Sequence, residues 1–153
     1  MPQNILVVDD EMSFRFYLKT LFETGGYTVE AARNGSEGLQ KARTKKPDLV
    51  VLDVMMPRKG GLEMYRGLRS DPVLCNVPVI MLSAVGAGTF AHALAMIGVA
   101  QGQLPPPQAY MEKPPCPEKL LNTVRTVLAS HEQDAKRHRE DKESCNAAQD
   151  SDC

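Results

Sequence analysis

Four charged side chains and one hydroxyl lie within two residues of the ends of apolar runs in this sequence. They are Asp9, Asp10, Asp53, Ser83 and Lys113. Burial makes the charge of a carboxylate costly, so an acid at the end of a buried segment needs a partner that offsets the desolvation. A single acid in such a place commonly caps the next helix. Five such residues at the ends of four separate apolar runs instead indicate one shared polar site.

The residue types point to one kind of chemistry. Carboxylates that lie close together raise one another's pKa values unless a cation lies between them. Ligands that are all oxygen favour a hard ion, and Mg²⁺ suits this set because it keeps several waters that phosphate oxygens can replace. A lysine ammonium adds a second positive charge for the same anion. These residues therefore predict a site for Mg²⁺ and a phosphate group.

The elements that must position these residues alternate along the chain. The strand-like segments are NILVVDD, YTVEAA, DLVVLD, VPVIMLSA and AYMEK, and helical patterns lie at 12–24, 36–45, 62–70, about 88–98 and 117 to about 130. Strands separated by helices predict an α/β parallel sheet with helices on both faces, because right-handed crossovers leave few other arrangements. Ligands of such sheets bind beyond the carboxyl ends of the strands. The five polar residues all fall at that edge.

Glycine, serine and proline mark the boundaries of these elements. Gly25 and Gly26 are expected to end the first helix, and Ser36 to cap the second. In the loop after Asp53 we expect Pro57 to supply a fixed φ and Gly61 a positive φ.

Four motifs together resemble the receiver domain of two-component response regulators. They are VVDDE, LVVLDVMMPRKGG, VIMLSA and YMEKPP, which occur in the family's order between residues about 4 and 130. Gly61 follows Asp53 by eight places and Pro114 follows Lys113, as in the family. The resemblance implies an α/β, flavodoxin-like (CheY-like) fold, with a doubly wound five-stranded parallel sheet and helices on both faces.

The resemblance also implies roles for the acids. Asp53 would accept a phosphoryl group from a phosphohistidine on a sensor histidine kinase or phosphotransfer protein. Asp10 and Asp53, together with the main-chain carbonyl of Met55, would bind Mg²⁺. Asp9 would act mainly through coordinated water.

The remaining site residues follow from the same resemblance. Lys113 would hold one phosphoryl oxygen, and the Ser83 hydroxyl with the Ala84 N–H would hold another. The family implies a switch in which Ser83 moves toward the new phosphate and Tyr110 rotates into the space that it leaves. Taken singly, Tyr110 is a packing residue; its place three residues before Lys113 favours the switch.

One region departs from the family. The stretch from Ala84 to Met111 contains no Asp, Glu, Lys or Arg. In the family this region is the output face, so an uncharged version predicts a surface for a downstream protein or for homodimer formation. The alternative is that the proline-rich segment Gln101–Ala109 folds back over the helix; the sequence does not decide its role.

Residues 1–130 are expected to form the receiver domain, and residues 131–153 a charged helical extension with a disordered tail. A net charge of -1 and a surplus of acids in the tail argue against nucleic-acid binding. We expect no membrane insertion, because no run approaches the roughly 20 apolar residues required. The N-terminus lacks a signal-peptide pattern, so we expect a cytoplasmic protein with four reduced, scattered cysteines.

The leading hypothesis is a stand-alone, phosphorylation-switched receiver that regulates a protein partner or relays the phosphate onward. We expect it to catalyse only its own phosphorylation and dephosphorylation and otherwise not to be an enzyme. A second is a Mg²⁺-dependent phosphatase with an aspartyl nucleophile, although Met55 occupies the place of the second acid such enzymes carry. A third is a constitutive interaction module with a vestigial site.

Overall fold

The structure, a computed structural model, describes residues 2–54, 60–84 and 105–150, and side chains as far as Glu140 except that of His138. Its strands are β1 (Asn4–Val8), β2 (Thr28–Ala32), β3 (Leu49–Asp53), β4 (Val79–Ser83) and β5 (Ala109–Glu112). Its helices are α1 (Met12–Thr24), α2 (Gly35–Thr44), α3 (Gly61–Ser70) and α5 (Pro117–Asp150). The helix expected at about 88–98 and the role expected for Pro57 lie outside the described residues.

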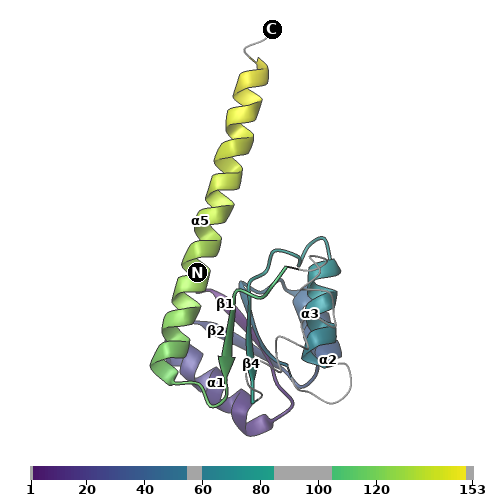
Figure 1. Ribbon diagram of the computed structural model, residues 1–153, viewed down its shortest axis with the longest axis vertical. Coiled ribbons are helices and arrows are strands. Elements are labelled where there is room, and N and C mark those ends of the chain that lie inside the picture. Colours follow the sequence, from purple (N-terminus) through teal and green to yellow (C-terminus); the bar gives the residue numbers. More distant parts are fainter. Residues whose placement is uncertain (1, 55–59, 85–104, 151–153) are drawn as a thin grey trace.

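The five strands form one parallel sheet in the order β2-β1-β3-β4-β5. Every residue of β1, β3 and β4 is buried, as expected for apolar runs covered on both faces. Helices α2 and α3 lie on one face, and α1 and α5 on the other (Figure 1). The predicted doubly wound, flavodoxin-like α/β fold is therefore confirmed.

Alternate residues of each strand feed two separate cores, because successive strand side chains point to opposite faces. In β1, Leu6 and Val8 pack toward α2 and α3, whereas Ile5 and Val7 pack toward α1 and α5. These two layers cover both faces of the sheet. The carboxyl ends of the strands are therefore left as the edge where polar side chains can gather.

The ends of α1 and α2 follow different local rules. Gly25 caps α1 and Gly26 adopts φ 94°, so the expected glycine stop is confirmed. The expected cap of α2 at Ser36 is wrong, because that residue lies inside the helix. The side chain of Asn34 accepts a hydrogen bond from the Glu37 N–H at 2.9 Å and caps α2 instead.

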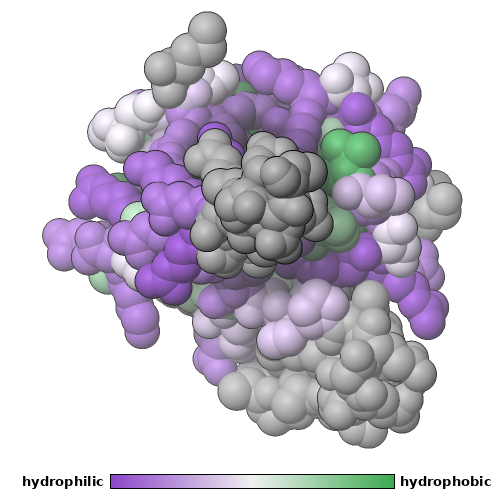
Figure 2. Space-filling view, turned by 90° about the horizontal axis from the view of Figure 1, so that it is seen from above, coloured by the Kyte–Doolittle hydropathy of each residue, from purple (hydrophilic) through white to green (hydrophobic). Residues whose placement is uncertain are grey.

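Helix α5 continues well beyond residue 130 and projects away from the sheet (Figure 1). The boundary that we expected after residue 130 therefore falls inside a helix, and the division into a receiver domain and an extension stays a prediction. Seen from the end to which α5 projects, the described side chains are mostly hydrophilic (Figure 2). Within the part of the chain that the structure describes, no helix has both the length and the apolarity to cross a bilayer.

Candidate functional site

Three carboxylates meet where β1 and β3 end. Val8 of β1 pairs with Leu52 of β3, so the next residues, Asp9 and Asp53, come side by side. One carboxylate oxygen from each of Asp9, Asp10 and Asp53 lies within 4.8 Å of the others. Asp9 and Asp53 are buried, whereas Asp10 is exposed. The cluster therefore opens to solvent on the side of Asp10.

Lys113 reaches this cluster from the end of β5. Its Nζ lies 2.6 Å from Asp9 Oδ2 and 3.3 Å from Asp53 Oδ2. Burial by itself lowers the pKa of Lys113, but the Asp9 hydrogen bond and the Asp53 charge outweigh it, and the pKa lies above its usual value. The ammonium is therefore charged at neutral pH and reduces the repulsion between the acids.

Asp9 is held from several sides. Its Oδ1 accepts the Glu11 N–H at 2.9 Å, and its Oδ2 accepts the Lys113 ammonium. Its main-chain oxygen accepts a hydrogen bond from Arg15 Nη1 at 2.7 Å. Because both carboxylate oxygens already have donors, Asp9 is better placed to organise the site than to serve as a bare ligand.

Gly61 lies against the backbone of Asp53. A Cβ at Gly61 would lie 2.0 Å from the Asp53 carbonyl oxygen and 2.8 Å from the Val54 Cα. The positive φ that we expected at Gly61 is wrong, since the positive-φ glycine among the described residues is Gly26. Gly61 is required instead because the first turn of α3 approaches Asp53 too closely for any side chain.

Ser83 and Tyr110 lie at neighbouring strand ends. Ser83 is fully buried at the end of β4, and its carbonyl accepts the Lys113 N–H at 2.8 Å. Burial raises the pKa of Tyr110, the Glu112 charge adds to the rise, and a hydrogen bond with the Ser83 side chain opposes it. The two residues expected to form the switch are therefore in contact.

The other expected site residues are placed as follows. Ala84 is exposed and directly follows Ser83. Met55 lies outside the described residues, so its main-chain carbonyl is not placed. The peptide bond between Lys113 and Pro114 is cis.

Two residues beside the acids were not predicted from the sequence. The ring of Phe14 lies 4.3 Å from Lys113 Nζ, and Arg15 binds the main chain of Asp9. Both belong to the first turn of α1, which begins directly after the acids. Their position just after β1 could have identified them, because the first turn of the helix that follows such a strand lies beside the strand end.

The chemistry of the donors fits a hard divalent cation. Carboxylate oxygens, one of them exposed and two of them buried, form a compact acidic cluster. Mg²⁺ binds through one or two such carboxylates and keeps waters in its remaining positions. With Lys113 as a further positive group, the arrangement can bind a phosphoryl group beside Asp53.

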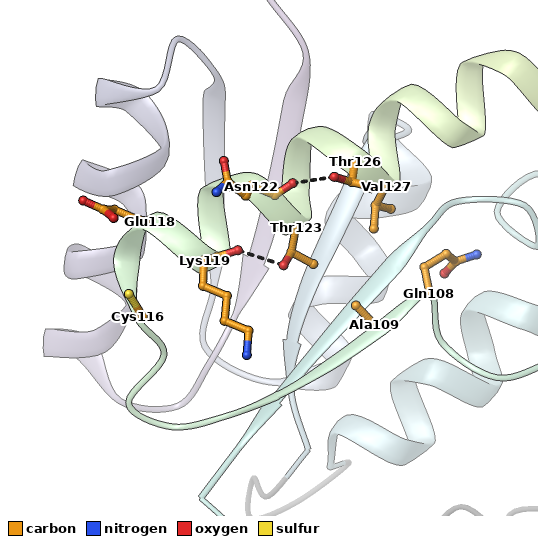
Figure 3. A pocket seen from close by; sticks show the side chains of 9 residues that line it. All are labelled: Gln108, Ala109, Cys116, Glu118, Lys119, Asn122, Thr123, Thr126 and Val127. Carbon is orange, nitrogen blue, oxygen red and sulfur yellow. Dashed lines mark hydrogen bonds between the residues drawn. The ribbon is translucent and has the colours of Figure 1, made fainter.

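A separate cavity of about 520 Å³ lies between β5 and α5 (Figure 3). Two of its hydroxyls, those of Thr123 and Thr126, donate to carbonyls of α5 itself. It shares no described lining residue with the acidic cluster. We therefore base the function on the acidic cluster, where opposite charges converge.

Known proteins share the sequence pattern and the fold of this chain. Residues 5–125 match the family model of the response regulator receiver domain. The chain is 32% identical to the polar-differentiation response regulator DivK of Brucella anthropi, over 84% of this chain and 98% of DivK. The Vibrio cholerae chemotaxis protein CheY4 superposes with a TM-score of 0.72 at 28% identity, over 83% of this chain and 99% of CheY4.

A second kind of relative is longer. The alkaline phosphatase synthesis transcriptional regulatory protein PhoP of Bacillus subtilis is 37% identical over 86% of this chain but only 51% of its own length. The chain therefore spans about half the length of this relative.

Proposed function

Because this chain belongs to the family of response regulator receiver domains, we propose that it is a phosphorylation-switched member of a two-component phosphorelay. In this proposal Asp53 accepts a phosphoryl group from a phosphohistidine of a sensor histidine kinase or phosphotransfer protein. The convergence of Asp9, Asp10 and Asp53 with the Lys113 ammonium is the observation that supports it. A receiver domain is a signalling protein, and we propose that the only reactions it catalyses are its own phosphorylation and dephosphorylation.

The proposed transfer is an in-line displacement. A carboxylate oxygen of Asp53 attacks the phosphorus, the P–N bond to the donor imidazole breaks, and the imidazole nitrogen keeps the bonding electron pair and takes up a proton. Mg²⁺, held by Asp10, Asp53 and the Met55 carbonyl, would neutralise charge on the phosphoryl oxygens. Asp9, whose oxygens both have donors, would act through coordinated water.

The other polar groups would bind the phosphoryl oxygens directly. Lys113 would turn from the Asp53 carboxylate to one phosphoryl oxygen, over a short distance because its Nζ already lies 3.3 Å from Asp53 Oδ2. The Ser83 hydroxyl and the Ala84 N–H would bind another oxygen. Breaking the Ser83–Tyr110 hydrogen bond then frees Tyr110 to rotate, which is the proposed switch.

The surface around the site supports a protein donor. Met12 and Phe16 are 75% and 72% exposed on α1, the helix that begins directly after the acids. The two lie four residues apart, on the same face of the helix, and a contiguous exposed apolar patch commonly marks a protein interface. We propose that this face receives the kinase or phosphotransfer protein in the cytoplasm, and that the face formed by Ala84–Met111 binds a downstream protein or a second copy of this chain. Residues 85–104 of that face lie outside the described residues.

The match to nearly the full length of DivK supports a stand-alone receiver, whereas PhoP carries additional sequence. We propose no contact with nucleic acid and no membrane insertion.

The deciding experiment uses Mg²⁺ with beryllofluoride, which mimics a phosphoryl group on an aspartate. We expect the backbone resonances of Ser83 and Tyr110 to shift, and Asp53→Asn to abolish the shift. Asp48→Asn is the matched control, because Asp48 precedes the same strand at its opposite end, where its Oδ2 accepts the Asn4 N–H. An unchanged spectrum of the unsubstituted protein would contradict the proposal.

Two outcomes would favour the competing hypotheses. Sustained turnover of a small phosphoester, lost in Asp53→Asn, would indicate a Mg²⁺-dependent aspartyl phosphatase. Absence of binding at millimolar Mg²⁺ would indicate a constitutive interaction module with a vestigial site.

A further inference from the structure

The described end of the proline-rich segment is fastened to α3. The Tyr65 hydroxyl donates a hydrogen bond to the Pro105 carbonyl oxygen. Arg69, one turn further along α3, donates from Nη2 to Gln108 Oε1 at 3.2 Å. A segment whose role the sequence left open is thus attached at two points to α3.

Gln108 in turn holds the start of β5 against the start of β4. Its main-chain N–H donates to the Val79 carbonyl at 3.0 Å, and its Oε1 accepts the Val79 N–H at 2.7 Å. Main chain and side chain of one residue therefore both bind Val79. Figure 3 shows the Gln108 side chain beside Ala109, the first residue of β5.

Arg69 is itself held in one position. Its Nη1 donates to the carbonyls of Cys75 and Val77, at 3.2 Å and 2.7 Å. Its guanidinium lies 4.9 Å from the ring centre of Tyr65, which is fully buried. A planar group with this many fixed contacts loses little further freedom when it also binds Gln108. We call Tyr65, Arg69 and Gln108 the β5 clamp.

The strand that the clamp holds is short and lies at the edge of the sheet. β5 has four residues and, among the described strands, pairs only with β4. A slip by one residue would move the chain by about 3.3 Å and turn Tyr110 to the opposite face. That displacement exceeds the 2.6 Å contact between Lys113 and Asp9. The register of β5 therefore decides whether the lysine reaches the acids.

We propose that Arg69 and Gln108 are positioning residues for Lys113, acting through the register of β5. The two residues lie at the end of the sheet opposite the acidic cluster, so they touch neither the acids nor the phosphoryl group. This inference rests on the proposed function for its consequence, but the register itself is testable without phosphate. It assigns a role to the end of the proline-rich segment, which is to connect α3 to the strand that carries the lysine.

The test compares four variants of the full chain: Gln108→Leu, Gln108→Glu, Arg69→Leu and Arg66→Leu. Gln108→Glu keeps an acceptor for both the Val79 N–H and Arg69, so it should restore wild-type behaviour. Arg66 is exposed on the same helix, and its side chain has no hydrogen-bond or ion-pair partner among the described residues, which makes it the control. Each variant is measured for hydrogen exchange at the β5 and Lys113 amides, for Mg²⁺ affinity, and for phosphorylation by acetyl phosphate.

We expect exchange at the Lys113 amide to rise roughly tenfold or more in Gln108→Leu and Arg69→Leu, because a charge-assisted hydrogen bond is lost from the clamp. The maximal phosphorylation rate should fall by about the same factor. Mg²⁺ affinity should change much less than the rate, since the acids that would hold the ion come from β1 and β3. If the two residues only stabilised the fold, the variants would have a lower melting temperature, and their phosphorylation rate and Mg²⁺ affinity would fall together.

Amide exchange and a phosphorylation rate at wild-type levels in Gln108→Leu would overturn the inference. Equal losses of phosphorylation rate in Gln108→Leu and Gln108→Glu would also overturn it. If the unsubstituted protein is not phosphorylated, the proposed function fails, but amide exchange still decides whether the clamp sets the register. If Arg69→Leu does not fold, Gln108→Leu and its Glu counterpart supply the comparison.

Discussion

The ammonium of Lys113 lies 4.3 Å from the centre of the Phe14 ring while its Nζ binds Asp9 at 2.6 Å. The lysine therefore has carboxylates on one side and an aromatic face on another. A ring face attracts a cation, and the attraction grows when the pair is partly desolvated. Phe14 thus restricts where the ammonium can go when it leaves Asp53.

Replacing Phe14 by leucine should slow phosphorylation by acetyl phosphate about two- to tenfold, the range expected for loss of a cation–π contact. Phe14→Tyr keeps the ring face and should retain the rate. Equal rates for the leucine variant and the unsubstituted protein would show that the ring does not assist the lysine.

Replacing the exposed ring of Phe16 should affect the reaction with a histidine kinase but not the reaction with acetyl phosphate. Phe16→Ser should lower phosphotransfer from a cognate histidine kinase by roughly fivefold or more, as expected for an interface anchor. It should leave the reaction with acetyl phosphate unchanged, because Phe16 is 72% exposed on α1. Wild-type transfer from the kinase would contradict the docking face that we propose.

Gly61→Ala should be strongly destabilising. The new Cβ would lie 2.0 Å from the Asp53 carbonyl oxygen, a clash with backbone that no rotamer relieves. We expect the free energy of unfolding to fall by about 3 kcal/mol, at the upper end for overpacking. Urea denaturation measures this loss.

The matched control is Gly67→Ala in the same helix. Its Cβ would meet only the end of the Leu39 side chain, at 2.8 Å, which can move. Alanine also favours helix over glycine by about 1 kcal/mol. A similar loss in both variants would mean that the clash at Asp53 is not the cause.

The cap of α2 gives a paired test. Asn34→Ala should lower the free energy of unfolding by about 1 kcal/mol, because the Glu37 N–H loses its acceptor. Ser36→Ala, inside the helix, should change stability little or raise it slightly. The reverse order in thermal denaturation would restore Ser36 as the cap.

Asp71 should make stability depend on acid pH. The Val73 N–H that donates to this carboxylate, together with Arg43, holds the pKa of Asp71 below its usual value. A lowered folded-state pKa stabilises the fold above the unfolded pKa of about 3.9, and this contribution is lost as pH falls through the folded pKa.

Asp71→Asn removes the titration but keeps an acceptor for Val73. The unsubstituted protein should therefore have a larger free energy of unfolding than Asp71→Asn at pH 7. This difference should shrink as the pH falls to about 2, below the usual pKa of an aspartate. A difference that stays constant over this range would assign it to causes other than the charge. Urea denaturation at several pH values measures it.

Local patterns in the sequence predicted the fold and the position of the site. Apolar runs that alternate with helical periods predicted a parallel sheet, and the carboxyl ends of such strands carry the ligand site. Asp9, Asp53 and Lys113 each directly follow or end such a run, so their positions could be read without knowing the strand order. The wrong expectations, Ser36 as a cap and a positive φ at Gly61, concern single residues whose neighbours in space were unknown.

The tertiary structure decided which distant residues meet. Phe14 and Lys113, or Tyr65 and Pro105, lie far apart along the chain and carry no shared pattern in the sequence. Periodicity reports which face of an element is buried, but the strand order and the path of each connection decide what that face touches. The sequence therefore determined the kind of site. The contacts that position Lys113, from Phe14 and through the β5 clamp, depend on the tertiary structure, in which β5 pairs with β4.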